Sequence, residues 1–336
     1  MRPKTLNLVT CLVAMLLAPV PGAAQASRHV STIVEFDPAA GELAEGVAVD
    51  KSGTVFVSLA PLGQLVKVEP GSTQAEPFGS VPGVDAASDL GLLGLAVDPR
   101  GDVYGAVVSA AAQGVWRFDR KTGAAERLPG TDAIGFPNGL AFDKRGNLYV
   151  TSSSEGSSPA GALLGGIWRI SRDGSVERVL VDEALGGLGV ILPTGVGANG
   201  IAYRHGLLYV ANTERATLLT IPVGPRGSLG VPTVIASGPQ LTFPDGLALD
   251  VHGNIYVAVI SQSTVVRVEP GGAIVPIADA SDGLDWTSSV AFGTGKRTRQ
   301  RLYAVNFAIG EQFGNPPGAG PALLTIDVGV PGQPLP

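Results

Sequence analysis

Short apolar segments recur along the chain, separated by turns rich in Gly, Asp and Asn. Within many segments apolar and polar residues alternate, as in "GIWRIS" and "VERVLVD", and β-branched residues are frequent. Alternation with a period of two is typical of antiparallel β-strands. Because no segment has the apolar spacing of an amphipathic helix, the pattern predicts an all-β protein.

One phrase, x-Gly-apolar-Ala-apolar-Asp, returns at intervals of 48, 45, 61, 46 and 43 residues. The copies are "EGVAVD" from Glu45, "LGLAVD" from Leu93, "NGLAFD" from Asn138, "NGIAYR" from Asn199, "DGLALD" from Asp245 and, in degraded form, "SSVAFG" from Ser288. Further strand-like segments follow each copy, such as "GNLYVT". A period in the forties built from short strands is the mark of a propeller blade. The sequence therefore predicts a six-bladed β-propeller with four-stranded antiparallel blades.

The repeated phrase also predicts how each blade is oriented. If it forms the innermost strand, its first residue opens onto one end of the central channel. The D-x-x-G sequence at its other end then makes a hairpin turn, because Asp bonds its own backbone and Gly accepts a left-handed conformation. His205 and His252 lie in these turns and should face away from the first residues, while His29 lies near the start of the mature chain.

The two ends of the chain are expected to close the ring together. The last repeat lacks a fourth strand, and "STIVEF" (31–36) precedes the first inner strand. We predict that this segment pairs beside "ALLTID" (322–327) and completes the sixth blade.

The N-terminal residues have the composition of a secretory signal. Arg2 and Lys4 precede an apolar stretch, and Ala24-Gln25-Ala26 supplies a small-x-small cleavage pattern. We expect a signal peptide at 1–26 and a propeller domain at 27–336, secreted or periplasmic, with no later apolar run long enough for a membrane span. Cys11, the only cysteine, would leave with the signal, which excludes disulfides and cysteine metal sites from the mature chain.

Charge narrows the range of partners. The formal net charge is −6 and 15% of residues are charged, with no basic patch. Nucleic-acid binding is therefore not expected, and a small molecule is the expected partner.

The first residue of the repeat carries the candidate chemistry. Around the ring this position reads Glu45, Leu93, Asn138, Asn199, Asp245 and Ser288. Four of these side chains offer carboxylate or amide oxygens, the donors that a hard divalent cation prefers, and no His or Cys accompanies them. We expect one Ca²⁺ ion, since four protein ligands would leave Mg²⁺ little of its water shell. The alternative is that Pro-Asn-Gly and Pro-Asp-Gly stand there as turn sequences for backbone reasons alone.

The phrases "AEGVAVD", "FPNGLAFD", "ANGIAYR" and "FPDGLALD" resemble the senescence marker protein/gluconolactonase family, which includes regucalcin and is related to diisopropyl fluorophosphatase and paraoxonase. The resemblance covers about residues 30 to 330. It implies that a Glu, two Asn and an Asp hold a catalytic calcium ion, here Glu45, Asn138, Asn199 and Asp245. Phe136 departs from the pattern, because family members acting on sugar lactones carry Arg at that position.

Together these features predict a calcium-dependent hydrolase of lactones or esters, phosphotriesters included. Asp245 would take the proton from water or attack directly, and Glu45 would mainly supply charge. Three long loops, 152–166, 185–198 and 306–322, would form lids, with Phe136, Leu92, Leu93 and Trp286 near the rim and with Glu155 and Glu311 solvated.

Two alternatives remain open. Repeats of this wording also resemble NHL propellers, which would make the protein a non-catalytic module that binds a protein or carbohydrate. A propeller lyase or a strictosidine-synthase-like enzyme is the other.

Overall fold

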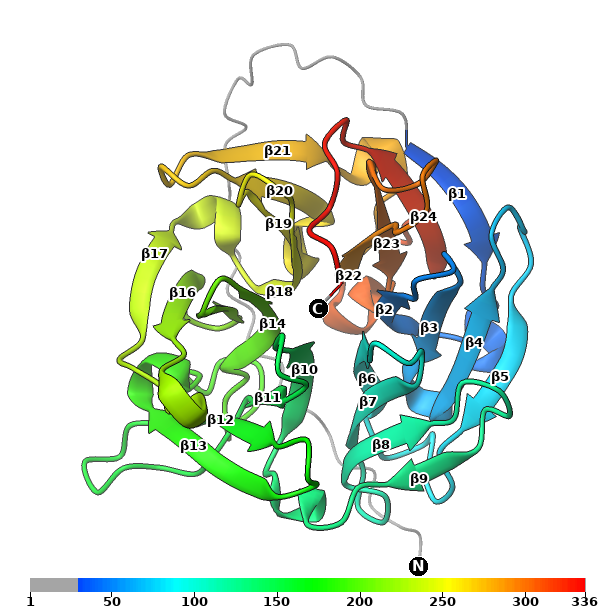
Figure 1. Ribbon diagram of the computed structural model, residues 1–336. Helices are drawn as coiled ribbons and strands as arrows, with labels where there is room; N and C mark the ends of the chain where they lie inside the picture. The colour runs from blue at the N-terminus through cyan, green and yellow to red at the C-terminus, as the bar shows by residue number, and fades with distance from the viewer. Residues whose placement is uncertain (1–29, 336) are drawn as a thin grey trace, which may run out of the picture.

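The computed structural model describes residues 30–335, and the predicted cleavage site near Ala26, together with Cys11 and His29, lies outside this range. Six four-stranded antiparallel sheets stand around a central axis and confirm the predicted propeller (Figure 1). Helical segments in the described part of the chain are short 3₁₀ turns, and none of its helices is long and apolar enough to cross a membrane.

The blades follow one another in chain order, with the innermost strand first. Blade 1 contains β2 (Ala44–Val49), β3 (Val55–Leu59), β4 (Gln64–Val68) and β5 (Glu76–Ser80); blade 2 contains β6 (Gly91–Val97), β7 (Val103–Val108), β8 (Gly114–Phe118) and β9 (Ala125–Arg127); blade 3 contains β10 (Pro137–Phe142), β11 (Leu148–Ser152), β12 (Gly165–Ile170) and β13 (Val176–Asp182). Blade 4 contains β14 (Ala198–Arg204), β15 (Leu207–Asn212), β16 (Thr217–Pro222) and β17 (Thr233–Ser237); blade 5 contains β18 (Pro244–Leu249), β19 (Ile255–Val259), β20 (Thr264–Val268) and β21 (Ile274–Ala278); blade 6 contains β22 (Thr287–Phe292), β23 (Arg301–Asn306), β24 (Ala322–Asp327) and β1 (Val30–Glu35).

The predicted closure is confirmed, because β1 is the outermost strand of blade 6. Its register with β24 pairs Val30 with Ile326 and Glu35 with Ala322. Val34 and Phe36 are buried in a core cluster that also contains residues of blades 1 and 6. The first and last strands of the domain therefore hold each other in place, and the ring has no free end.

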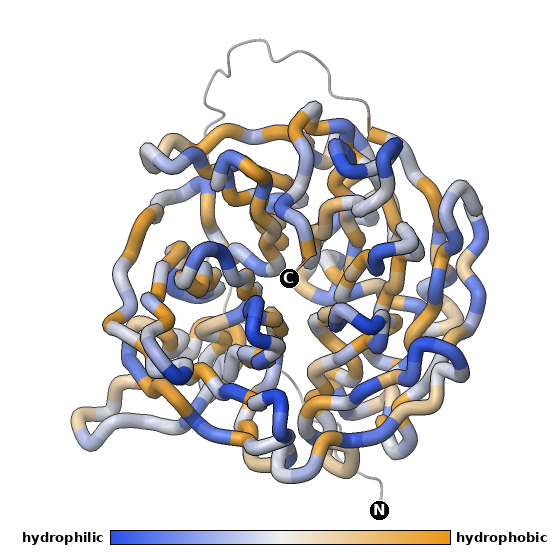
Figure 2. The backbone as a smooth tube through the Cα atoms, viewed as in Figure 1, coloured by the Kyte–Doolittle hydropathy of each residue, from blue (hydrophilic) through white to orange (hydrophobic). Residues whose placement is uncertain are grey.

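The hydrophobic core lies between neighbouring blades. The clusters each combine side chains from adjacent sheets, and Figure 2 shows apolar residues concentrated along the strands with hydrophilic residues in the connecting turns. The D-x-x-G turns are structural, as expected. In blade 3, for example, the Asp143 carboxylate accepts hydrogen bonds from the backbone N–H groups of Arg145 and Asn147.

The glycine of the repeated phrase has a packing role that the pattern did not reveal. A Cβ atom at Gly139 would overlap the carbonyl oxygen of Asn199, and one at Gly200 would overlap the carbonyl oxygen of Asp245. Each inner strand thus approaches the first residue of the next repeat at backbone distance. This close approach brings the variable first residues together at one end of the channel.

The C-terminal segment up to Leu335 lies across the opposite end of the channel, and Figure 1 shows this part of the chain running toward the centre of the ring. The backbone N–H of Gln333 donates to Leu249 O at 2.9 Å, and its side-chain amide donates to Tyr203 O at 2.7 Å. Pro334 and Leu335 line the same cavity as the inner strands. The repeat pattern gives this tail no role, whereas in the structure it covers one mouth of the channel.

Candidate metal centre

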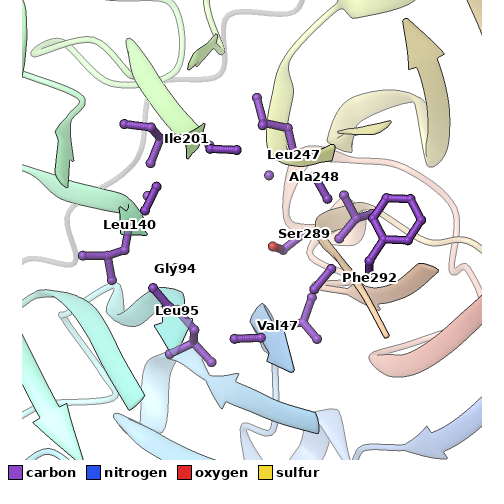
Figure 3. Close-up of a pocket in the computed structure, with 18 of the residues that line it drawn as sticks. Val47, Gly94, Leu95, Leu140, Ile201, Leu247, Ala248, Ser289 and Phe292 are labelled. Carbon is purple, nitrogen blue, oxygen red and sulfur yellow. The ribbon is translucent and has the colours of Figure 1, made fainter. Parts of the chain in front are cut away.

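The central channel contains a cavity of about 210 Å³ that brings the four candidate ligands together. Glu45, Asn138, Asn199 and Asp245 begin or nearly begin their inner strands, and all four line this cavity. They are buried, with exposed fractions of 5–7%. Figure 3 shows the adjoining side chains of Leu140, Ile201 and Leu247 surrounding the same space from neighbouring blades.

The remaining two ring positions do not contribute oxygen ligands to the cavity. Leu93 is buried in an apolar cluster with Phe136. Ser288 donates its hydroxyl hydrogen to the carbonyl oxygen of Glu45 at 2.7 Å and so joins blade 6 to blade 1. The set that faces the channel is therefore two carboxylates and two amides.

Two buried hydroxyl groups decide which way the amides point. Ser153 Oγ donates to Ala198 O at 2.7 Å, and Thr213 Oγ1 donates to Pro244 O at 2.9 Å. A hydroxyl group has a single hydrogen, so toward a second partner it can only accept. Asn138 Nδ2 donates to Ser153 Oγ at 3.2 Å, and Asn199 Nδ2 donates to Thr213 Oγ1 at 3.1 Å. Both amide oxygens are consequently left to face the cavity.

Among the residues that the structure describes, no Lys, Arg or His contributes to the pKa shift of either carboxylate. Burial and repulsion by Asp245 raise the pKa of Glu45 well above its ordinary value. Burial likewise raises the pKa of Asp245 to about 7, against a smaller lowering by a hydrogen bond from the Asn199 side chain. Glu45 Oε2 is buried and has no hydrogen-bond partner among residues 30–335. A buried carboxylate oxygen without a partner is costly, and a cation beside it would remove that cost.

These observations fit a hard divalent cation. The donors are oxygens of mixed charge, and their number leaves room for water or substrate oxygens, as Ca²⁺ sites allow. Between residues 30 and 335 there is no group of three or more His, Cys, Asp and Glu side chains that could hold a metal. A cation in the channel would therefore depend on the two amide oxygens as well as the two carboxylates.

The histidines lie where the turn pattern predicted. His205 is in the turn between β14 and β15, and the His252 N–H donates to Asp250 Oδ1 in the turn between β18 and β19. Both turns are at the end of the inner strands opposite Asn199 and Asp245. Neither histidine is placed to act as a base beside the four ligands.

Two details of the predicted rim are wrong. Leu92 is fully buried in the core between blades 1 and 2, since its side chain packs in the cluster that contains Val107. Glu155 is not solvated, because its carboxylate accepts from Trp168 Nε1 at 2.6 Å and pairs with Arg178 at 3.0 Å while its side chain is only 4% exposed. Glu311 is exposed, as expected. Trp286 stacks on the exposed Phe313 with ring centroids 4.9 Å apart.

The repeat pattern does not reveal Ser153, Thr213 and Glu214, which act on the site from the loops. The hydroxyls orient the amides, and the Glu214 carboxylate accepts backbone hydrogen bonds from the 188–196 segment. The places of Ser153 and Thr213 in their repeats are a weak signal of their role, because each directly follows the second strand of a blade whose inner strand carries an Asn ligand. For Glu214 there was no pattern to find, because its partners are backbone N–H groups.

Comparisons with known proteins place the chain among related propellers. A family model described as the SMP-30/Gluconolactonase/LRE-like region matches residues 84–305. Regucalcin, a calcium-binding protein from Agrobacterium tumefaciens, superposes with a TM-score of 0.65 at 19% identity over 93% of this chain and 96% of that one. A luciferin-regenerating enzyme gives 0.66 at 16% over 92% and 98%, and a gluconolactonase from Xanthomonas campestris gives 0.62 at 18% over 90% of each chain. At these identities the superpositions show the fold alone. No curated protein sequence matches significantly.

Proposed function

Because the chain belongs to the SMP-30/gluconolactonase/LRE-like family, we propose that it is a calcium-dependent hydrolase of lactones or esters. The observation that carries the proposal is the buried oxygen set of Glu45, Asn138, Asn199 and Asp245, in which Glu45 Oε2 has no partner in the described part of the chain. A structural turn sequence would account for Asn138 or Asp245 singly. It does not account for two buried carboxylates in one channel, Glu45 on blade 1 and Asp245 on blade 5, of which the first has an oxygen without a partner among residues 30–335.

Each ligand has a defined part in the proposed reaction. When bound, a calcium ion would polarise the substrate carbonyl and position water beside it. The Asp245 carboxylate accepts a proton from the attacking water as its oxygen forms a bond to the carbonyl carbon. As the acyl carbon–oxygen bond breaks, that proton passes to the departing alkoxide, so a lactone becomes a hydroxy acid. Glu45 supplies the second negative charge, and the amide oxygens of Asn138 and Asn199 hold the geometry.

We also propose that the protein acts after export, as a secreted or periplasmic enzyme. The supporting observation is the N-terminal sequence, in which Arg2 and Lys4 precede an apolar stretch and a small-x-small cleavage pattern. Mass spectrometry of the protein recovered from its own host should find a mature N-terminus at Ser27. An intact N-terminus in the mature protein would contradict export by cleavage.

The test of the metal site compares two positions of the same ring. Asp245→Ala removes half of the ligand charge and should abolish high-affinity calcium binding in titration calorimetry. Leu93→Ala changes the corresponding residue of blade 2, which offers no oxygen, and should leave the affinity intact. Unchanged affinity in Asp245→Ala would rule out the site.

The test of activity uses the same protein with several substrate classes. Turnover of a lactone or an aryl ester should stop with a chelator and return when calcium is added. If the calcium-bound protein hydrolyses no lactone, aryl ester or phosphotriester, a binding propeller is the better account of the fold.

A further inference from the structure

An apolar cluster borders the ligand end of the channel. Its buried members are Ala60, Leu93, Phe136 and Val196, and the partly buried Val108, Ile191, Leu192 and Phe307 pack against them. Taken around the ring, they belong to blade 6 (Phe307), blade 1 (Ala60), blade 2 (Leu93 and Val108), blade 3 (Phe136) and the connection into blade 4 (Ile191, Leu192 and Val196). All lie at the end of their blades that carries the ligands. We name this set the apolar arc, because it continues from blade to blade around most of the mouth.

The arc is adjacent to the ligands along the chain. Leu93 occupies the ring position between Glu45 and Asn138, and Phe136 stands two residues before Asn138. Val196 stands three residues before Asn199. The partly buried Val108, Ile191, Leu192 and Phe307 leave apolar surface exposed at this end, so a substrate whose carbonyl reaches the ligands from here places its remaining atoms beside apolar side chains.

A buried carboxylate holds the blade 4 part of the arc in place. Glu214 Oε1 accepts from the N–H groups of Ile191 at 2.9 Å and Val196 at 3.0 Å, and its Oε2 accepts from Val190 at 3.2 Å and also from Leu188. These bonds lower the pKa of Glu214 despite its burial, so the carboxylate stays ionised. Because its oxygens are committed to the backbone of the 188–196 segment, Glu214 is a positioning residue and does not face substrate.

We infer that the site takes lactones or esters bearing an uncharged apolar substituent, an alkyl chain or an aromatic ring, and discriminates against polyhydroxylated lactones. This inference rests on the proposed hydrolytic function and names its substrate class. Apolar substituents gain by leaving water for the arc. Hydroxyl groups placed there lose their hydrogen bonds to water and find no donor or acceptor among the arc side chains. Polyhydroxylated lactones should therefore bind less well than lactones with an apolar substituent.

The experiment measures hydrolysis by the calcium-loaded protein across γ-butyrolactone, γ-octalactone, γ-undecalactone and glucono-δ-lactone. Each added methylene that reaches the arc should raise kcat/KM about fourfold, the factor that corresponds to about 0.8 kcal/mol. Glucono-δ-lactone should be the poorest substrate. If kcat/KM did not change with the length of the alkyl chain, or were highest for glucono-δ-lactone, the inference would be overturned while the hydrolase itself stayed established.

Substitutions locate the preference on the arc. Phe136→Ala and Leu93→Ala should flatten the chain-length series, whereas Val234→Ala, at a 51% exposed position on β17, should keep it. Glu214→Gln should raise KM for γ-undecalactone more than it lowers kcat, because it loosens the wall without touching the reacting atoms. Circular dichroism and melting temperature confirm that each variant is folded. If kcat/KM still rose steeply with chain length in both Phe136→Ala and Leu93→Ala, the apolar substituent would be recognised elsewhere than on the arc.

A binding measurement separates the inference from the function on which it rests. Calorimetric affinity for γ-undecalactone should exceed that for γ-butyrolactone, and Phe136→Ala should reduce the difference. If this holds without any hydrolysis, the arc is a binding wall and the hydrolase proposal fails. Equal affinities, or no binding of either lactone, would show that the arc does not recognise apolar ligands.

Discussion

Ser153→Ala tests whether the structure has identified the cause of amide orientation in the candidate metal centre. The substitution removes a fully buried hydroxyl that accepts from Asn138 Nδ2 at 3.2 Å and donates to Ala198 O at 2.7 Å. Two effects follow, and they can be measured separately. The carbonyl of Ala198 loses its side-chain donor, and the Asn138 amide loses the partner that turns its oxygen toward the cavity.

The matched control is Ser58→Ala. Ser58 is also fully buried, accepts from Gly46 N at 2.7 Å and donates to Leu93 O of the next blade at 2.9 Å, but it does not contact a ligand side chain. Each substitution leaves buried polar groups without a partner and should lower the free energy of unfolding by about 1–3 kcal/mol. Residues that orient metal ligands typically contribute 10- to 100-fold in affinity, so only Ser153→Ala should weaken calcium binding, by about that factor.

Calcium affinity is measured by titration calorimetry and stability by denaturant unfolding of the calcium-free proteins. The expected pattern is a similar loss of stability in both variants and a loss of affinity in Ser153→Ala alone. An undiminished calcium affinity in Ser153→Ala would refute the idea that Ser153 orients a metal ligand. A comparable loss of affinity in Ser58→Ala would show that loosening any contact between blades disturbs the site.

Three further predictions concern closure, catalysis and the tail. A chain starting at Gly41 lacks β1 and the buried Val34 and Phe36. Because truncating one buried Phe to Ala already costs about 3–5 kcal/mol, the melting temperature of this chain should fall well below that of the full domain. Equal melting temperatures would exclude closure by β1. Replacing His29, His205 and His252 together with Gln should leave calcium-dependent turnover largely intact, whereas Asp245→Asn should lower kcat by about a hundred- to ten-thousand-fold at saturating calcium; an inactive but folded histidine variant would overturn the carboxylate mechanism. In a protein lacking Cys11, a Ser289→Cys thiol in the channel should react faster with a charged thiol reagent when the chain ends at Gly329, because the tail no longer covers the mouth; equal rates would show that the tail is not a barrier.

Much of the architecture could be predicted because each blade repeats the same local sequence pattern. Period-two alternation, D-x-x-G turns and a spacing in the forties specify strands, hairpins and blades from residues that are neighbours along the chain. The pairing of β1 with β24 followed from counting the strands of the last repeat. The order of Glu45, Asn138, Asn199 and Asp245 around one end of the channel followed from the same repeat.

The details that give these residues their chemical properties come from contacts that no repeat encodes. Ser153 and Thr213 fix the amides because each bridges to a carbonyl of the next blade, and Glu214 gathers backbone N–H groups 18 to 26 positions away. Glu155 was wrongly expected in solvent because its partners Trp168 and Arg178 lie on other strands of its blade. The tail lies across the channel because carbonyls of blades 4 and 5 accept from Gln333 and the Arg299 carbonyl accepts from the N–H of Gly332. Sequence periodicity determined the strands and their order, and packing between blades decided which polar atoms face the channel, since only in the closed ring do those atoms meet their partners.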